Sequence, residues 1–264
     1  MAAPVAYKTS RPVRQLLFGL GSALTVLLVL WGSARALDAL SIREQRSARS
    51  YAGVTAVDLR NAHGDVRVVR TRGSRVRVTV DSRSGLLGAG RREADFVGGV
   101  LRLRGGCHLV TIGTCDEDYR IALPAGLPID VRTTAGEAVA IGLRGDVELH
   151  SRAGAVRAVD VRGGRLLLDS RAGGITIERS AARTVEATTA AGEVDVELIR
   201  APSSVDAQSR AGEVTVRVPD VGYVVDADTS AGREDVRVRQ PPGARRSIRA
   251  RSRAGDVSVQ PLAR

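Results

Sequence analysis

A four-residue cassette recurs through the C-terminal half of the chain and is the feature that most constrains its fold. It consists of a hydroxyl residue, any residue, alanine and glycine, and in most copies alternating aliphatic and polar residues follow. Successive glycines are 18 to 23 residues apart. A repeat of about twenty residues is typical of a solenoid, in which each coil stacks only on its neighbours. The glycines that we expect at the coil corners are Gly136, Gly154, Gly173, Gly192, Gly212, Gly232 and Gly255.

Each position of the cassette has a physical explanation. Glycine adopts a positive φ without steric cost and therefore suits a sharp corner between two short strands. Alanine before it suits a tight inside corner, and the hydroxyl can bond either nearby backbone or its equivalents in neighbouring coils. Residues 193–196, Glu-Val-Asp-Val, alternate as a strand does, with valine facing inward. The sequence therefore predicts an all-β fold, a single-stack β-solenoid with coils of about 19–20 residues.

Two places break the regular spacing. Residues 233–238 fit the pattern only if two residues are inserted after Gly232, which indicates a bulge or a widened corner. A degenerate early copy ends at Gly64, and the 72 residues between Gly64 and Gly136 leave room for three to four coils. About ten coils would then form a rod of about 45 Å, because neighbouring strands lie about 4.8 Å apart.

The stretch between Gly64 and Gly136 holds both regular and irregular segments. Residues 75–80 and 100–104 alternate as strands do. Residues 82–92 and 105–118 do not, and we expect them to leave the stack as excursions.

The N-terminal part has a different character. Residues 15–34 are uncharged, which is long enough for a helix that spans a bilayer. The alternative is a secretory signal peptide cleaved near Ala36, because residues 34–36 resemble an A-x-A site. Both alternatives place the rest of the chain outside the cytoplasm. The expected organisation is a short cytoplasmic segment at 1–14, a transmembrane anchor at 15–36, a linker at 37–50 and the extracytoplasmic β-solenoid at 51–264.

The net charge of +11 comes almost entirely from arginine, because Lys8 is the only lysine. A composition rich in arginine at solvated positions explains this charge without a function, whereas a basic face would attract anionic polymers or lipid headgroups. Nucleic-acid binding is not predicted, because stacking aromatic residues and recognition motifs are lacking. Four arginines share the position before the cassette alanine and should lie on one side of the rod: Arg152, Arg171, Arg210 and Arg253. Acidic residues directly after the corner glycines should partly neutralise them: Glu137, Glu193, Glu213 and Asp256.

The two cysteines, Cys107 and Cys115, flank a glycine-containing polar loop. In an oxidising compartment they would pair and close this loop. A metal site is the alternative, since His108 and the acidic residues 116–118 are near, yet the spacing matches no zinc signature. We therefore predict a disulfide and no metal.

These segments together resemble a bacterial family of putative adhesin domains, the domain of unknown function 4097, especially its actinobacterial members. The resemblance rests on residues 51–54, 64–68, 99–107 and 115–126 and on the repeated cassettes, so that it covers nearly the whole chain. It implies a β-solenoid displayed on the cell envelope, and it implies no catalytic residues.

The sequence contains no motif of a hydrolase nucleophile, a zinc protease or a nucleotide-binding loop. His63, His108 and His150 are scattered, which favours structural or solvated roles. We expect no enzyme activity and no cofactor. A polysaccharide-cleaving β-helix enzyme is the less favoured alternative, because the coils are short and sugar-stacking aromatic residues are few.

Three non-catalytic functions remain open. The first is a binding or adhesion module for anionic envelope polymers, the second is an envelope-stress ectodomain that binds another membrane protein, and the third is a passive spacer.

Overall fold

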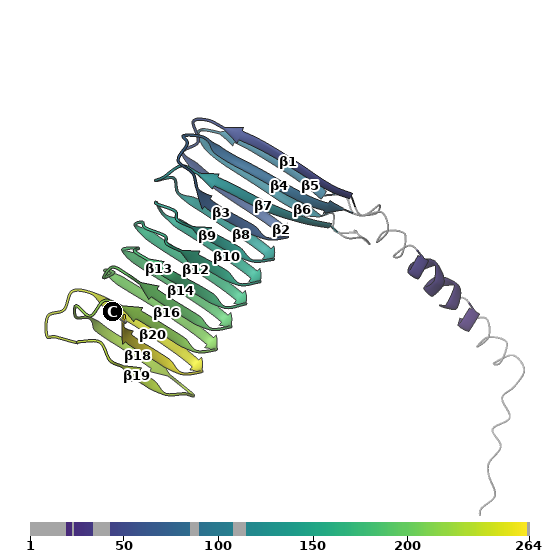
Figure 1. Cartoon of the computed structure of the whole chain (residues 1–264). Helices are drawn as coiled ribbons and strands as arrows, with labels where there is room; N and C mark the ends of the chain where they lie inside the picture. Colours follow the sequence, from purple (N-terminus) through teal and green to yellow (C-terminus); the bar gives the residue numbers. More distant parts are fainter. Residues whose placement is uncertain (1–19, 23, 34–42, 85–89, 108–114, 263–264) are drawn as a thin grey trace, which may run out of the picture.

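The computed structural model describes residues 20–22, 24–33, 43–84, 90–107 and 115–262. Its strands form two long sheets, and each coil of the repeat contributes one strand to each sheet (Figure 1). Sheet A contains, in spatial order, β1 (Arg43–Tyr51), β4 (Val76–Ser84), β7 (Cys115–Leu123), β3 (Val66–Arg70), β9 (Ala138–Ile141), β11 (Val156–Val159), β13 (Ile175–Ser180), β15 (Val194–Leu198), β17 (Val214–Val218), β21 (Val257–Pro261) and β19 (Glu234–Val236). Sheet B contains β18 (Val224–Thr229), β20 (Ser247–Ala254), β16 (Ser204–Ala211), β14 (Thr184–Ala191), β12 (Arg165–Ala172), β10 (Val147–Ala153), β8 (Ile129–Ala135), β2 (Ala56–His63), β6 (Val100–Cys107) and β5 (Gly90–Val97).

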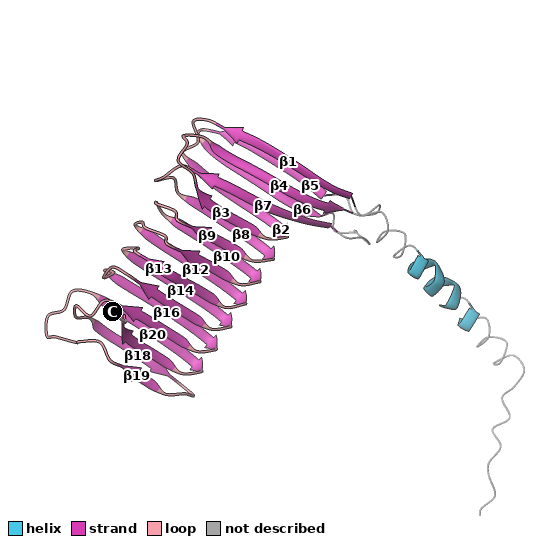
Figure 2. Cartoon of the chain, in the orientation of Figure 1, coloured by secondary structure: helices cyan, strands magenta, loops and turns pink. Residues whose placement is uncertain are grey.

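The all-β prediction is confirmed (Figure 2). The described residues of the predicted membrane anchor, 20–22 and 24–33, are helical, and the rest of the span 15–36 lies outside the described residues. Within the described part of the chain, no helix has both the length and the apolar character that a membrane crossing requires. Residues 43–50, which the sequence analysis assigns to a linker, belong to β1.

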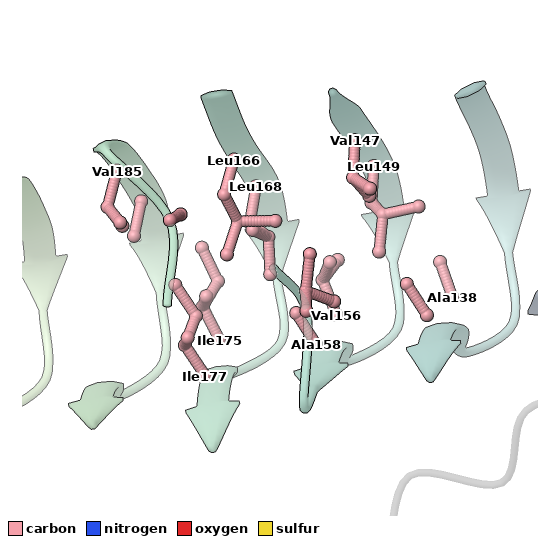
Figure 3. Close-up of a cluster of buried hydrophobic side chains, with 14 of the residues drawn as sticks. Ala138, Val147, Leu149, Val156, Ala158, Leu166, Leu168, Ile175, Ile177 and Val185 are labelled. Atoms are coloured by element: carbon pink, nitrogen blue, oxygen red, sulfur yellow. The ribbon is translucent and has the colours of Figure 1, made fainter. Parts of the chain in front are cut away.

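The core lies between the two sheets and consists of the inward-facing residue of each alternating pair. Val147 and Leu149 on β10 face Val156 and Ala158 on β11, and all four are completely buried (Figure 3). Burying a valine or leucine side chain contributes about 1.5–3 kcal/mol relative to exposure. The alternation of the sequence therefore accounts for both the strands and the core.

The corners join neighbouring coils through hydrogen bonds. The backbone amide of Gly192 donates to the carbonyl of Ala211, 2.9 Å away, and the Ser209 hydroxyl donates to the carbonyl of Gly192, also at 2.9 Å. Equivalent hydroxyl bonds to the glycine of the adjacent coil come from Ser151, Ser170, Thr189, Thr229 and Ser252. The hydroxyls thus link coils, as a ladder would, but their acceptors are backbone carbonyls.

The cassette alanines correct one prediction. Ala153, Ala172 and Ala191 are exposed at the bend rather than packed into an inside corner. These alanines join the coils through their backbone instead. Each alanine carbonyl accepts a hydrogen bond from the amide of the glycine in the adjacent coil.

The coils do not stack in sequence order at the C-terminal end. β20 and β21 lie between the coil β16–β17 and the coil β18–β19, so that the last coil is inserted into the stack. β19 pairs with β21 in the register Glu234–Val257 and Val236–Val259, the same 23-residue offset that separates Gly232 from Gly255. No residues are inserted after Gly232, and the predicted bulge or widened corner is wrong. Gly232 lies against Gly255 and lacks the positive φ of the other predicted corners.

The N-terminal end departs from sequence order as well. The amide of Gly64 donates to the carbonyl of Ala135, 3.1 Å away, so that the first coil stacks directly on the coil of Gly136. The predicted three to four coils between them are therefore wrong. The intervening strands β4 to β7, together with β1, extend both sheets on the outer side of β2 and β3 instead, with antiparallel pairs β1–β4, β4–β7 and β5–β6.

The strand-like runs at 75–80 and 100–104 are confirmed by β4 and β6. The excursions predicted at 82–92 and 105–118 are wrong where the structure describes them, because those residues continue β4, β5, β6 and β7. Residues 85–89 and 108–114 lie outside the described residues. Eleven and ten strands in the two sheets agree with a rod of about 45 Å.

Candidate functional site

The solvent face of sheet B carries the four arginines that the cassette position predicts to align. Ser151 pairs with Ser170 and Ala153 with Ala172, which places Arg152 beside Arg171. The same register between β16 and β20 places Arg210 beside Arg253. The two arginine pairs are separated by Ala190 on β14. Arg253 neighbours Arg210 only because the last coil is inserted into the stack, so that this pair depends on a topology that the sequence did not predict.

The same face is hollowed along these strands. One depression of about 910 Å³ runs across β12, β14, β16, β20 and β18 and is lined by Arg171, Arg210 and Arg253. A second depression of about 430 Å³ runs across β2, β8, β10 and β12 and contains Arg152. Both are lined by Asp169 and Arg171, so they adjoin, and we call them together the arginine groove.

The charges in the arginine groove are unequally neutralised. Its other arginines have acidic partners: Arg132 is 2.7 Å from Asp130, Arg251 is 2.7 Å from Asp226, and Arg60 is 3.5 Å from Asp58. Four further arginines are exposed, and their side chains have no ion pair or hydrogen bond among the described residues: Arg152, Arg171, Arg210 and Arg253. Four cationic groups on one face therefore remain available to an anion.

The acidic residues after the corner glycines do not pair with these arginines. Glu137 lies 4.0 Å from Arg157 on sheet A, and Asp256 accepts a bond from the Arg233 amide. The chain has turned the corner by then, and its next side chains belong to the other sheet. The predicted partial neutralisation of the arginines therefore does not occur through ion pairs among the described residues.

Hydrogen bonding and burial set the pKa values of two aspartates on this face. Burial raises the pKa of the Asp130 carboxyl, although Arg132 and His150 oppose this shift. Hydrogen bonds from Arg251 and Arg249 hold the pKa of the exposed Asp226 below its ordinary value. Asp226 therefore stays ionised and occupies Arg251, while Asp130 is less easily ionised than an exposed aspartate.

The described structure does not test the disulfide. Cys107 ends β6 and Cys115 begins β7, and the Cys107 side chain lies outside the described set. The pairing of these two cysteines stays a prediction.

A cluster that was missed from the sequence adjoins the arginine groove, and its His150 is part of the groove lining. The ligand atoms of Asp130, Glu148 and His150 all lie within 4.8 Å of one another. Asp130 and Glu148 each stand six residues before a corner glycine, so aligning the coils by their glycines would have brought them together. From the sequence, a structural or solvated role is predicted for His150, as for the other two histidines.

With this geometry in place, the family can be identified. The model of the Toastrack DUF4097 family matches residues 52–260. The chain belongs to this family. The match spans the strands from β2 to β21, in agreement with the resemblance seen in the sequence.

Solved structures are similar to this chain at low sequence identity. A putative adhesin from Bacteroides fragilis is 13% identical, with 83% of this chain and 97% of that chain covered and a TM-score of 0.54. A putative lipid binding protein from Parabacteroides distasonis is 10% identical, with coverage of 83% and 97% and a TM-score of 0.44. None of the curated proteins compared with the chain matches it. The similarity to the Bacteroides fragilis structure concerns the fold alone.

Proposed function

We propose that this Toastrack domain is a non-catalytic binding module that holds a linear anionic polymer of the cell envelope in the arginine groove. The observation that carries the proposal is the alignment of Arg152, Arg171, Arg210 and Arg253 in one groove without acidic partners among the described residues. An unpaired arginine is a strong donor to phosphate or carboxylate, because its planar guanidinium offers two parallel N–H groups.

The shape of the groove favours a polymer over a small anion. The groove crosses strands from β2 to β18, that is, most of the length of sheet B. The members of each arginine pair lie on adjacent strands, about 4.8 Å apart, and the facing edges of the two pairs lie about 10 Å apart across Ala190. An extended chain with repeated charges can contact both pairs at once, whereas a single phosphate reaches one.

The groove lining supports a binding role rather than hydrolysis. Its two carboxylates are Asp169 on β12 and Asp228 on β18. Four strand spacings separate these strands, which places the carboxylates about 19 Å apart. Paired glycosidase carboxylates stand about 5–10 Å apart, so this pair is too widely separated to act on one glycosidic bond.

Envelope display is part of the proposal. Its support is the uncharged stretch at residues 15–34, which the sequence analysis interprets as a membrane anchor or, alternatively, a cleaved signal. In either case the arginine groove would face the wall and surface polymers outside the cytoplasm.

The test is the fourfold variant Arg152→Gln, Arg171→Gln, Arg210→Gln and Arg253→Gln. We expect it to bind linear polyphosphate about tenfold or more weakly than the wild type at low salt and to show a shallower salt dependence, because fewer counterions are released. Isothermal titration of the full chain with polyphosphate, and with orthophosphate as the monomeric comparison, measures both quantities.

A second fourfold variant controls for net charge. Arg67, Arg77, Arg120 and Arg200 are also exposed and lie outside the groove. Changing these four to glutamine removes the same charge and should leave most of the affinity intact. Equal losses in the two variants would show that affinity follows net charge alone, and the groove proposal would then be abandoned.

A further inference from the structure

Three carboxylates stand side by side on the outer face of sheet B, beyond the edge of the arginine groove. The strand register pairs Asp58 with Asp130 and Asp130 with Glu148. Like charges on adjacent strands repel at this separation of about 5 Å. Asp58 and Asp130 each have an arginine nearby, at 3.5 Å and 2.7 Å, but no ion pair of Glu148 is found among the described residues. These three carboxylates therefore have a negative charge that the neighbouring side chains do not fully neutralise.

His150 completes this arrangement from the same strand as Glu148. Its Nδ1 atom lies 3.9 Å from a carboxylate oxygen of Asp169. Its Nε2 atom is shielded from solvent and has no hydrogen-bond partner among the described residues, and the same is true of Oδ1 of Asp130. A shielded polar atom without a partner is costly and requires an explanation, such as an ion.

We propose that Asp130, Glu148 and His150 bind a divalent transition-metal ion of the zinc class. Their ligand atoms lie within 4.8 Å of one another. Ligands of a tetrahedral zinc ion stand about 3.3 Å apart, given bonds of about 2.0 Å, so that small side-chain rotations close the site. An imidazole with two carboxylates suits zinc and its neighbours rather than magnesium, which prefers oxygen ligands only.

The surroundings of His150 fit a metal ligand. A ligating histidine usually donates its second ring N–H to a carboxylate, which fixes the ring with the other nitrogen toward the ion. Asp169 stands in that position on the Nδ1 side, and the atom left without a partner is Nε2. Because Asp130 belongs to β8 and the other two ligands to β10, a bound ion would join two neighbouring coils.

The full chain, produced without a polyhistidine tag and stripped with a chelator, tests the site by titration with Zn²⁺. We expect one ion per chain and a rise in the thermal midpoint on the order of 5 °C at saturating metal. Mg²⁺ should bind far more weakly. The variants His150→Ala and Glu148→Gln should each lower the zinc affinity at least about tenfold, and Asp169→Asn should lower it by a similar factor through the lost orientation of the ring.

His63→Ala is the matched control. His63 is exposed and occupies a cassette alanine position, so its removal should leave zinc binding unchanged. Both ligand substitutions lie on the outer face of sheet B and leave no core cavity, and circular dichroism checks that each variant is folded. Unaltered zinc affinity in folded His150→Ala or Glu148→Gln, or no zinc binding by the wild type, would overturn the proposal.

Discussion

Gly192→Ala is expected to lower the free energy of unfolding by about 3–5 kcal/mol, although it adds a single methyl group. An ideal Cβ at Gly192 would lie 2.5 Å from the carbonyl oxygen and 2.6 Å from the carbonyl carbon of Gly173 in the adjacent coil. Both atoms belong to backbone held in the stack, so a side-chain rotation cannot relieve the overlap. The backbone φ of +148° at Gly192 adds conformational strain, and each of these two effects costs about 1–3 kcal/mol.

Urea unfolding followed by circular dichroism measures this loss, and Gly243→Ala separates its two causes. Gly243 also has a positive φ, +78°, but an added Cβ would meet no atom within 4 Å. That variant should lose only about 1–2 kcal/mol, the cost of the backbone conformation. Gly192→Val should be less stable than Gly192→Ala. If Gly192→Ala and Gly243→Ala lowered the free energy of unfolding equally, the close stacking of the corner glycines would not be the reason that Gly192 excludes a side chain.

The regular middle of the solenoid was predictable because one period specifies both the corner and the core. Each cassette fixes a glycine, a buried hydroxyl and the inward-facing aliphatic residues after it. The order of coils at the two ends was not predictable, because nearly identical cassettes can stack on one another in any order. Gly255 could follow Gly232 or Gly212 in the stack with the same local contacts, and the structure has the second.

The candidate sites were also predictable only in part. The alignment of Arg152 with Arg171 follows from their shared cassette position, whereas the alignment of Arg210 with Arg253 also requires the inserted last coil. The cluster around His150 was missed because its members come from neighbouring coils and carry no motif along the chain. Asp130 and Glu148 stand at the same distance from their corner glycines, and the strand register places them side by side.

A buried ion pair at the N-terminal end of the rod is also outside the repeat pattern. Glu117 on β7 is only 1% exposed, and its carboxylate is 2.8 Å from Nε of Arg92 on β5. The same carboxylate accepts the hydroxyl of Tyr119 at 3.3 Å, and burial raises the pKa of that hydroxyl. Arg92 also donates to the hydroxyl of Ser82 on β4 at 2.5 Å. Because β5 belongs to sheet B and β7 to sheet A, this cluster joins the two sheets where the antiparallel strands close the stack.

Glu117→Gln is therefore expected to lower the free energy of unfolding by about 3 kcal/mol, measured by urea unfolding followed by circular dichroism. Removing one partner of a buried pair costs about 3–5 kcal/mol, and the lower end applies because the Arg92 side chain is 31% exposed. Glu44→Gln is the control, since it breaks the exposed Arg83–Glu44 pair of the same region and should cost at most about 1 kcal/mol. The double variant Arg92→Met, Glu117→Leu removes both charges. It should be more stable than Glu117→Gln, because no uncompensated charge remains. A double variant less stable than Glu117→Gln would instead show that the ion pair itself holds the two sheets together.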